Sequence, residues 1–239
     1  MILCATAEDP ATEREYVDLL LQERVGGIVA FPTGENQDLW RSAQDLGTRI
    51  LFVDRAVEGI DAASISVDHL TGARNATEHL LALGHRRIGY LGGPDKLTSG
   101  SMREAGYRRA HADYGVPVDD RLVVRTRFTR ETAYASAVRL LDAPDPPSAL
   151  FAGNNVLGEA ALTAVHDRGL RLPDDISMVM FDDVSWAKLI DPPVTVVAQP
   201  TRQLGVLAAR TVLTAEPGTQ ELLLAPELVV RRSTAAFYG

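Results

Sequence analysis

Cysteine is almost absent from this sequence of 239 residues, which contains only Cys4. A single thiol forms neither an internal disulfide nor a cysteine-rich metal site, and this fits a reducing compartment. No apolar run approaches the roughly 18 to 20 residues that a membrane span needs. The opening residues, MILCATAEDP, also lack the basic and apolar regions of a secretory signal. These absences lead us to expect a cytoplasmic protein with no membrane partner.

Basic residues are outnumbered by acidic ones. The 24 Lys and Arg face 32 Asp and Glu, which gives a formal net charge of -8. Surfaces that bind nucleic acid are usually basic, so we expect these residues to bind DNA poorly by themselves. The length suffices for one large or two ordinary domains, and a hydrophobic fraction of 46% is typical of a globular chain with a sizeable core.

Catalytic signatures are missing as well. We find no G-x-x-x-x-G-K phosphate loop, no G-x-S-x-G elbow and no H-E-x-x-H pair. The glycines of GYLGGP at 89–94 lack the G-x-G-x-x-G spacing of a dinucleotide site, so we interpret them as a tight strand exit. We interpret the five histidines, which show no metal-ligand spacing, as capping or surface side chains: His69, His79, His85, His111 and His166. We therefore expect no metal, no cofactor and no enzyme activity.

Short apolar runs alternate with amphipathic stretches along the whole chain, beginning with the run at 1–5. This alternation is typical of βα units that form a parallel sheet. A stripe at helical spacing before Gly84 predicts an amphipathic helix and consists of Ala73, Ala76, Thr77, Leu80 and Leu81. The expected strands include 28–31, 49–53, 64–67, 88–91, 122–125, 149–152, 176–181, 194–197, 221–224 and 228–231. The class is α/β, but periodicity leaves open one doubly wound sheet or two smaller sheets.

Polar residues directly follow several of these strands, where open parallel sheets bind ligands. They are Asp54, Asn154, Asn155, Asp182, Asp183 and Gln199. Together they suggest a hydrogen-bonding pocket. Each also has a plain structural explanation: Asp54 can pair with Arg55, Asn154 can cap the next helix, and Asp182 can close an Asx-turn.

Longer segments of the sequence resemble the ligand-binding core of the lactose repressor and galactose repressor (LacI/GalR) family of bacterial transcription regulators. The resemblance covers essentially the whole chain. It is carried by LFVDR at 51–55, VDHLTGARNATEHLLALGHRRIGYLGGP at 67–94, SMREAGYRRA at 101–110, AGNN at 152–155, GLRLPDDISMVMFDD at 169–183 and PPVTVVAQP at 192–200.

This resemblance implies two Rossmann-like subdomains of the periplasmic-binding-protein-like type, with parallel sheets flanked by helices and three hinge crossings. The crossings are expected near 67–68, 199–200 and 226–227. The N-terminal effector-binding subdomain is then 1–67 plus 200–226, and the C-terminal one is 68–199 plus 227–239.

The resemblance also implies an effector site. Its residues are Asp54, Arg103, Phe128, Asn154, Asp182 and Gln199. Carboxylates and amides suit adjacent hydroxyls, the Arg103 guanidinium is a planar fork, and Phe128 can lie flat on a sugar ring or a base. The plain alternatives are a surface ion pair of Arg103 with the helix of Glu104 and a core role for Phe128. We expect Asp182 to be an exposed carboxylate whose removal changes stability little.

The sequence departs from the family at its beginning and near residue 155. Family members start with a helix-turn-helix, a hinge helix, and a strand and helix that open the first subdomain, whereas the resemblance here starts at the second strand. In a 2-1-3-4-5 sheet the first strand is interior, so its loss is expected to expose strand edges. A fragment, an internal start and a degraded paralogue all remain open. Asn155 and Gly158 replace the usual Asp and Ala, and the change at Gly158 is expected to affect helix packing more than the pocket.

We therefore expect the effector-sensing and dimerising region of a repressor-type transcription regulator. Its partners are a small carbohydrate or related metabolite, a second copy in a homodimer, and DNA through a helix-turn-helix that these residues do not contain. A periplasmic-type sugar-binding protein shares the implied fold but needs an export signal. A sugar or nucleoside hydrolase needs two acids around one bond, and the sequence neighbours Asp182 and Asp183 rarely converge in that way.

Overall fold

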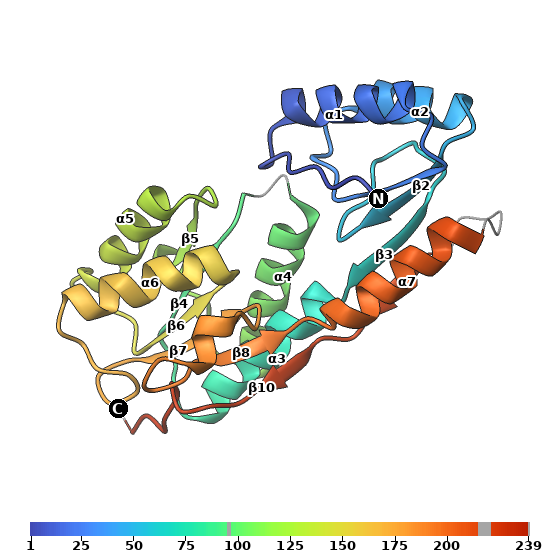
Figure 1. Ribbon diagram of the computed structural model, residues 1–239. Helices are drawn as coiled ribbons and strands as arrows, with labels where there is room; N and C mark the ends of the chain where they lie inside the picture. Colours follow the sequence, from blue (N-terminus) through green and yellow to red (C-terminus); the bar gives the residue numbers. More distant parts are fainter. Residues whose placement is uncertain (95–96, 215–220, 239) are drawn as a thin grey trace. The chain divides into compact units, whose positions relative to one another are not determined.

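Two compact units make up the protein, whose computed structural model describes residues 1–94, 97–214 and 221–238 (Figure 1). Unit 1 is Met1–Val67 with Pro200–Leu224, and unit 2 is Asp68–Gln199 with Ala225–Gly239. The third passage of the chain between the units thus follows Leu224, two residues before the crossing expected at 226–227.

Unit 2 is built on a six-stranded sheet in the order β10-β8-β7-β6-β4-β5. All neighbouring strands are parallel except β10, which runs antiparallel to β8. The strands are β4 (Ile88–Gly92), β5 (Val123–Arg125), β6 (Ala149–Ala152), β7 (Ser177–Phe181), β8 (Thr195–Ala198) and β10 (Glu227–Val229). Numbered along the chain, the five parallel strands have the doubly wound order 2-1-3-4-5. The chain adds strands first on one side of β4 and then on the other, so the strand order reverses between β4 and β6.

Helices cover both faces of this sheet. They are α3 (His69–Ala82), α4 (Thr98–Asp113), α5 (Arg130–Leu141) and α6 (Asn155–Asp167), with short 3-10 turns at Asp120–Leu122 and Ser185–Lys188. Every residue of β4, β6 and β7 is buried, because alternate side chains enter the core on opposite faces. The expected α/β class, with parallel sheets flanked by helices, is confirmed.

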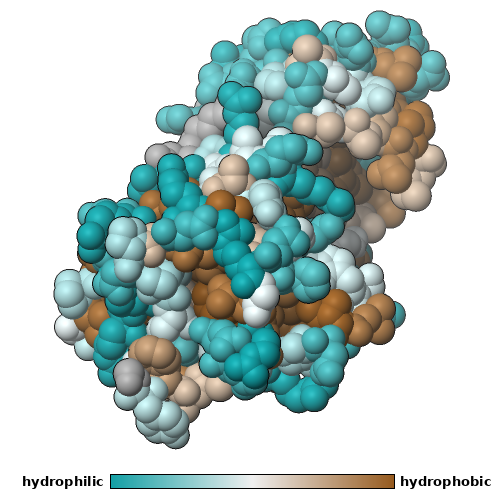
Figure 2. Space-filling model, turned by 90° about the vertical axis from the view of Figure 1, so that its left-hand side faces the viewer, coloured by the Kyte–Doolittle hydropathy of each residue, from teal (hydrophilic) through white to brown (hydrophobic). Residues whose placement is uncertain are grey.

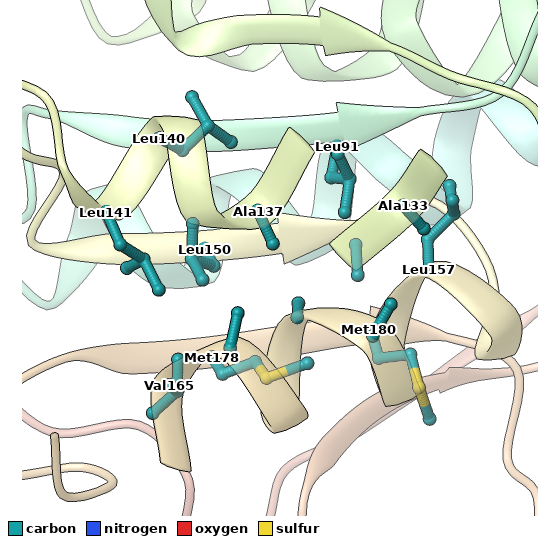
Figure 3. Packing of buried hydrophobic residues seen from close by; sticks show 14 of the residues in the cluster. Leu91, Ala133, Ala137, Leu140, Leu141, Leu150, Leu157, Val165, Met178 and Met180 are labelled. Atoms are coloured by element: carbon teal, nitrogen blue, oxygen red, sulfur yellow. The ribbon is translucent and has the colours of Figure 1, made fainter. Parts of the chain in front are cut away.

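The core on the α5 and α6 side is shown in Figure 3, where Leu91, Leu150 and Met178 of the sheet face the two helices. Gly158 of α6 lies directly against Met180, so a Cβ there would overlap the Met180 sulfur. This contact agrees with the expectation that Gly158 concerns helix packing. The side of unit 2 that carries α5 and α6 is mostly hydrophilic, with hydrophobic areas between the polar side chains (Figure 2).

On the other face, α3 and α4 pack closely together. The predicted stripe of α3, Ala73 to Leu81, is buried as expected. At Gly106 of α4 a Cβ would overlap the carbonyl oxygen of Leu70, so only glycine allows this approach. The close packing brings the start of α3 beside the middle of α4.

Unit 1 has a four-stranded parallel sheet in the order β1-β2-β3-β9. Its elements are α1 (Pro10–Gln22), β1 (Gly27–Ala30), α2 (Gln37–Asp45), β2 (Arg49–Val53), β3 (Ala63–Val67), α7 (Thr201–Thr214) and β9 (Glu221–Leu224). One face packs on α1 and α2 through Trp40 and Phe52, and the other packs on α7 through Ala208. The two sheets therefore form separate cores.

The apolar run at 1–5 was expected to be a strand, and this is wrong. Residues 1–6 form no strand, and Met1 and Leu3 are exposed. A strand needs a neighbour that pairs with its N–H and C=O groups, and no strand in the described part of the chain pairs with these residues. β1 is an edge strand, and its Val29 is 42% exposed.

Over the described ranges, with their gaps at 95–96 and 215–220, no helix has the length and apolar character to span a bilayer.

Candidate functional site

The carboxyl ends of β4, β6, β7 and β8 form one edge of the unit 2 sheet, and the strand order reverses between β4 and β6. Open α/β sheets bind ligands at such a reversal. Arg103 reaches this edge from α4, and its Nη1 donates to the carbonyl oxygen of Gly153 at 2.6 Å. The guanidinium carbon lies 3.9 Å from the centre of the Phe181 ring. The edge therefore holds a planar donor group whose position is tied to β6 and β7.

Arg103 is a buried residue, only 6% exposed. The alternative of a surface ion pair with the helix of Glu104 is wrong, because Glu104 binds Arg108 and Arg125 instead. Burial acts to raise the pKa of Glu104, but the hydrogen bonds from Arg125 and Arg108 hold that pKa below its ordinary value. The neighbouring carboxylate is thus occupied by other guanidinium groups.

Asp182 leaves β7 in the left-handed region, with a φ of 81°, and its N–H donates to the carbonyl oxygen of Val197. Its Oδ1 accepts a hydrogen bond from Gln199 Nε2 at 2.5 Å, and its Oδ2 accepts one from the Asn155 N–H at 3.1 Å. The residue is half-buried. Asp182 is therefore not the exposed carboxylate that was expected, and two donors have it as their acceptor.

Asp183 points elsewhere and forms an ion pair with Arg231 at 2.7 Å. The two neighbouring acids therefore have different partners, as expected from their adjacency in the sequence.

Asn154 and Phe128 lie at the same edge, and each has the plain role considered above. Asn154 caps α6, because its Oδ1 accepts from the Leu157 N–H at 2.8 Å. Phe128 is half-buried against the core of α5 and α6, and its ring covers Gly93 so closely that a Cβ there would overlap it. Gly93 has no side chain, and this allows the Phe128 ring to lie directly against it.

Asp54 belongs to unit 1, at the carboxyl end of β2. Its φ is 68°, and its N–H donates to the carbonyl oxygen of Ile65. The expected pairing with Arg55 is present, with 3.7 Å between Arg55 Nε and Asp54 Oδ2. Arg55 also holds Glu8 through two hydrogen bonds of 2.7 Å, and these raise the pKa of Arg55 despite its burial. Five of the six predicted residues thus share one sheet edge, and the sixth lies at the corresponding edge of the other unit.

The structure adds His69 to this group, which the sequence reasoning missed. Its Nδ1 lies 3.4 Å from Nε and 3.3 Å from Nη2 of Arg103, and it is only 5% exposed. The hydroxyl of Tyr90 is also buried at this edge without a partner in the described part of the chain, and burial raises the pKa of that tyrosine. No sequence spacing signals either residue, because both reach the edge through helix and sheet packing.

The interpretation of the histidines as capping or surface side chains is wrong for most of them. His69, His85 and His111 are buried. His79 binds Thr234, His85 binds Ser148 and Ala235, and His111 contacts the carbonyl oxygen of Val116. Burial lowers the pKa of His79, His85 and His111. Among the described residues no group of three or more His, Cys, Asp or Glu is placed to hold a metal ion.

Comparison with known proteins agrees with this fold. Residues 77–234 match the family described as periplasmic binding protein-like domain. The chain is 36% identical to the HTH-type transcriptional regulator DegA of Bacillus subtilis (strain 168), over 98% of this chain and 72% of DegA. The fold and the match together define a periplasmic binding protein-like domain.

Two solved structures extend the comparison. The transcriptional regulator CelR in complex with cellobiose has a TM-score of 0.82 and 30% identity, over 93% of this chain and 70% of that chain. A LacI family transcriptional regulator from Enterococcus faecium with bound ribose has a TM-score of 0.84 and 25% identity, over 94% and 85% of the two chains. The chain belongs to the LacI family of HTH-type transcriptional regulators. It spans 63% to 72% of the length of several curated regulators that it resembles.

Proposed function

We propose that this chain is the effector-sensing and dimerising region of a cytoplasmic transcription regulator and that it binds a small carbohydrate or a related polyhydroxylated metabolite. The observation that carries the proposal is that the Arg103 fork and the Asp182 carboxylate, which the Gln199 amide holds, lie at the same edge of the unit 2 sheet. Neighbouring hydroxyls of a sugar are both donors and acceptors, so they match a site that combines a donating guanidinium, an accepting carboxylate and an amide. The sugars in the two related structures, cellobiose and ribose, belong to this class.

Phe128 and Asn154 complete the unit 2 part of the proposed site. The ring of Phe128 offers an apolar face, and sugar rings carry C–H groups that pack on aromatic rings. Asp54, the sixth predicted residue, belongs to unit 1. Effector binding shifts the population of conformations, and DNA contact falls to the helix-turn-helix for which the related regulators are named.

We further propose that the protein binds and releases its effector without changing it chemically. A glycosidase uses two carboxyl groups on either side of one bond. Asp183 is held by Arg231, and Asp182 is held by uncharged donors, which supports a binding role.

Calorimetric titration with D-ribose, cellobiose, sugar alcohols and nucleosides tests this proposal. Because a hydrogen bond to a charged group contributes about 1.5 to 3 kcal/mol, we expect Arg103→Ala to weaken binding of the best compound about tenfold or more. Arg103→Lys keeps the positive charge without the planar fork, so we expect its affinity to lie between those of the wild type and Arg103→Ala.

Arg109→Ala is the matched control, because Arg109 lies on the same helix and its side chain is 67% exposed beside Asp113. Unchanged affinity in Arg103→Ala, with circular dichroism intact, removes Arg103 from the site. Failure of every polyhydroxylated compound to bind contradicts the proposed class of effector.

A further inference from the structure

His69 is the first residue of α3, immediately after Asp68, whose carboxylate accepts the Thr71 N–H at 2.9 Å. The capped start of the helix sets the position of the imidazole. The imidazole lies 5.7 Å from the Phe181 ring, and the Arg103 guanidinium stacks on that same ring at 3.9 Å. The imidazole and the guanidinium therefore share an aromatic neighbour and meet each other at Nδ1.

The chemistry of this contact determines the state of the imidazole. A guanidinium has only N–H donors and no acceptor, so the ring nitrogen that faces it must offer a lone pair. Nδ1 is then unprotonated, and the single ring proton lies on Nε2. A proton on Nδ1 would oppose two donors and, in the imidazolium form, a second positive charge.

We propose that His69 is a positioning residue of the effector site and that its neutral Nε2–H form orients the Arg103 fork toward the effector. Gly153 holds the fork at Nη1, and His69 holds it at Nε and Nη2. Two anchoring points on opposite sides of a planar group fix both its place and its plane, and a site held in this way binds more tightly than a mobile one. This inference rests on the proposed function, because it takes Arg103 as a contact of the effector.

The first test needs no effector. Protein labelled with ¹⁵N-histidine contains five imidazoles, and a spectrum of the His69→Asn variant identifies the signals of His69 by their loss. Near neutral pH we expect Nδ1 of His69 to give the shift of an unprotonated nitrogen and Nε2 that of a protonated one. A proton on Nδ1, or on both nitrogens, overturns the proposal.

The second test uses two variants of similar size. In His69→Asn the Oδ1 atom takes the place of Nδ1 and can accept from Arg103, whereas His69→Leu has no acceptor. We expect His69→Leu to weaken binding of D-ribose or cellobiose about tenfold and His69→Asn to stay within about threefold of wild type. A purely structural role would not distinguish a folded Leu variant from a folded Asn variant in this way.

The outcomes separate this inference from the proposed function. If both variants bind as wild type while Arg103→Ala does not, His69 has no positioning role and the proposed site stands. If neither sugar binds the wild-type protein, those two effectors are rejected, and the protonation state of His69 decides the inference. His166→Leu, at a side chain that is 88% exposed, controls for the loss of an imidazole.

Discussion

Asp54 in unit 1 and Asp182 in unit 2 leave their strands in the same way and end in different surroundings. Both have a positive φ, 68° and 81°, and both donate their N–H to a carbonyl oxygen of the next strand. Asp54 then faces the guanidinium of Arg55, which Glu8 also holds. Asp182 accepts from an amide and a backbone N–H, both uncharged.

The difference shows that the parallel sheet fixes the turn, while the neighbouring strand ends decide its chemistry. A carboxylate beside a paired guanidinium is part of an ionic network. A carboxylate held by neutral donors keeps a charge that a ligand can still approach. Both units thus contain the same positive-φ aspartate turn at a strand end, but the carboxylate has charged partners in unit 1 and uncharged partners in unit 2.

The largest expected effect is a difference in stability between alanine variants of Asp182 and Asp54. Asp182→Ala leaves the Gln199 amide and the Asn155 N–H without their acceptor, so we expect it to destabilise unit 2 by about 1 to 3 kcal/mol. Asp54→Ala leaves Arg55 with Glu8, so we expect unit 1 to lose less than about 1 kcal/mol. Urea unfolding followed by fluorescence measures both, because Trp40 lies in unit 1 and Trp186 in unit 2.

Glycine variants sharpen that measurement. Alanine keeps the strain of a positive φ and glycine relieves it, so Asp54→Gly and Asp182→Gly should each be about 1 kcal/mol more stable than the alanine variants. Equal losses for Asp54→Ala and Asp182→Ala would contradict the difference drawn between the two turns.

Acid is expected to affect the two units differently, because all five histidines lie in unit 2. Burial lowers the pKa of His79, His85 and His111 in the folded state. The unfolded chain then binds more protons below its own histidine pKa of about 6.5. Stability of unit 2 should therefore fall as the pH drops through that value and level off below the lowered folded pKa.

Urea unfolding at a series of pH values measures this effect. We expect the combined His79→Gln and His85→Gln variant to flatten the dependence, whereas His166→Gln, at an exposed position, should leave it unchanged. A steeper acid loss in unit 1 than in unit 2 between neutral pH and pH about 5.5 would count against burial of these imidazoles as the cause.

The smallest expected effect concerns salt. The loss caused by Asp54→Asn, a few tenths of a kcal/mol, should shrink in about 1 M sodium chloride because ions screen its pairing with Arg55. The loss caused by Asp182→Asn should change less, since the partners of Asp182 are uncharged. The same fluorescence measurement at low and high salt checks both, and identical salt responses would argue against the ionic character of the unit 1 turn.

Much of the fold could be predicted from local patterns. The bounds of β2, β6 and β9 agree with the predicted strands, because each is a short run of apolar side chains between turn residues. The start of α4, at Thr98, is harder to predict. Leu97 precedes this helix without a side-chain cap, so the sequence carries no marker for its first turn.

The six predicted site residues were found through the resemblance and through their places after strands. The pairing of Asp54 with Arg55 and the capping role of Asn154 were predicted, but the partners of Arg103 were not. Arg103 binds Gly153 and His69, which are 50 and 34 residues away along the chain. Such contacts depend on how α3 packs against α4 and how α4 meets the sheet.

By itself the sequence determined the alternation of strands and helices, the family, and the polar residues at the strand ends, because periodicity, turns and long motifs are local. Only the tertiary structure decided that residues 1–6 stay outside the sheet, that most of the histidines are buried, and that His69 meets Arg103. The physical reason is that a strand, a buried imidazole and a guanidinium all need partners. Those partners come from distant parts of the chain that only packing brings together.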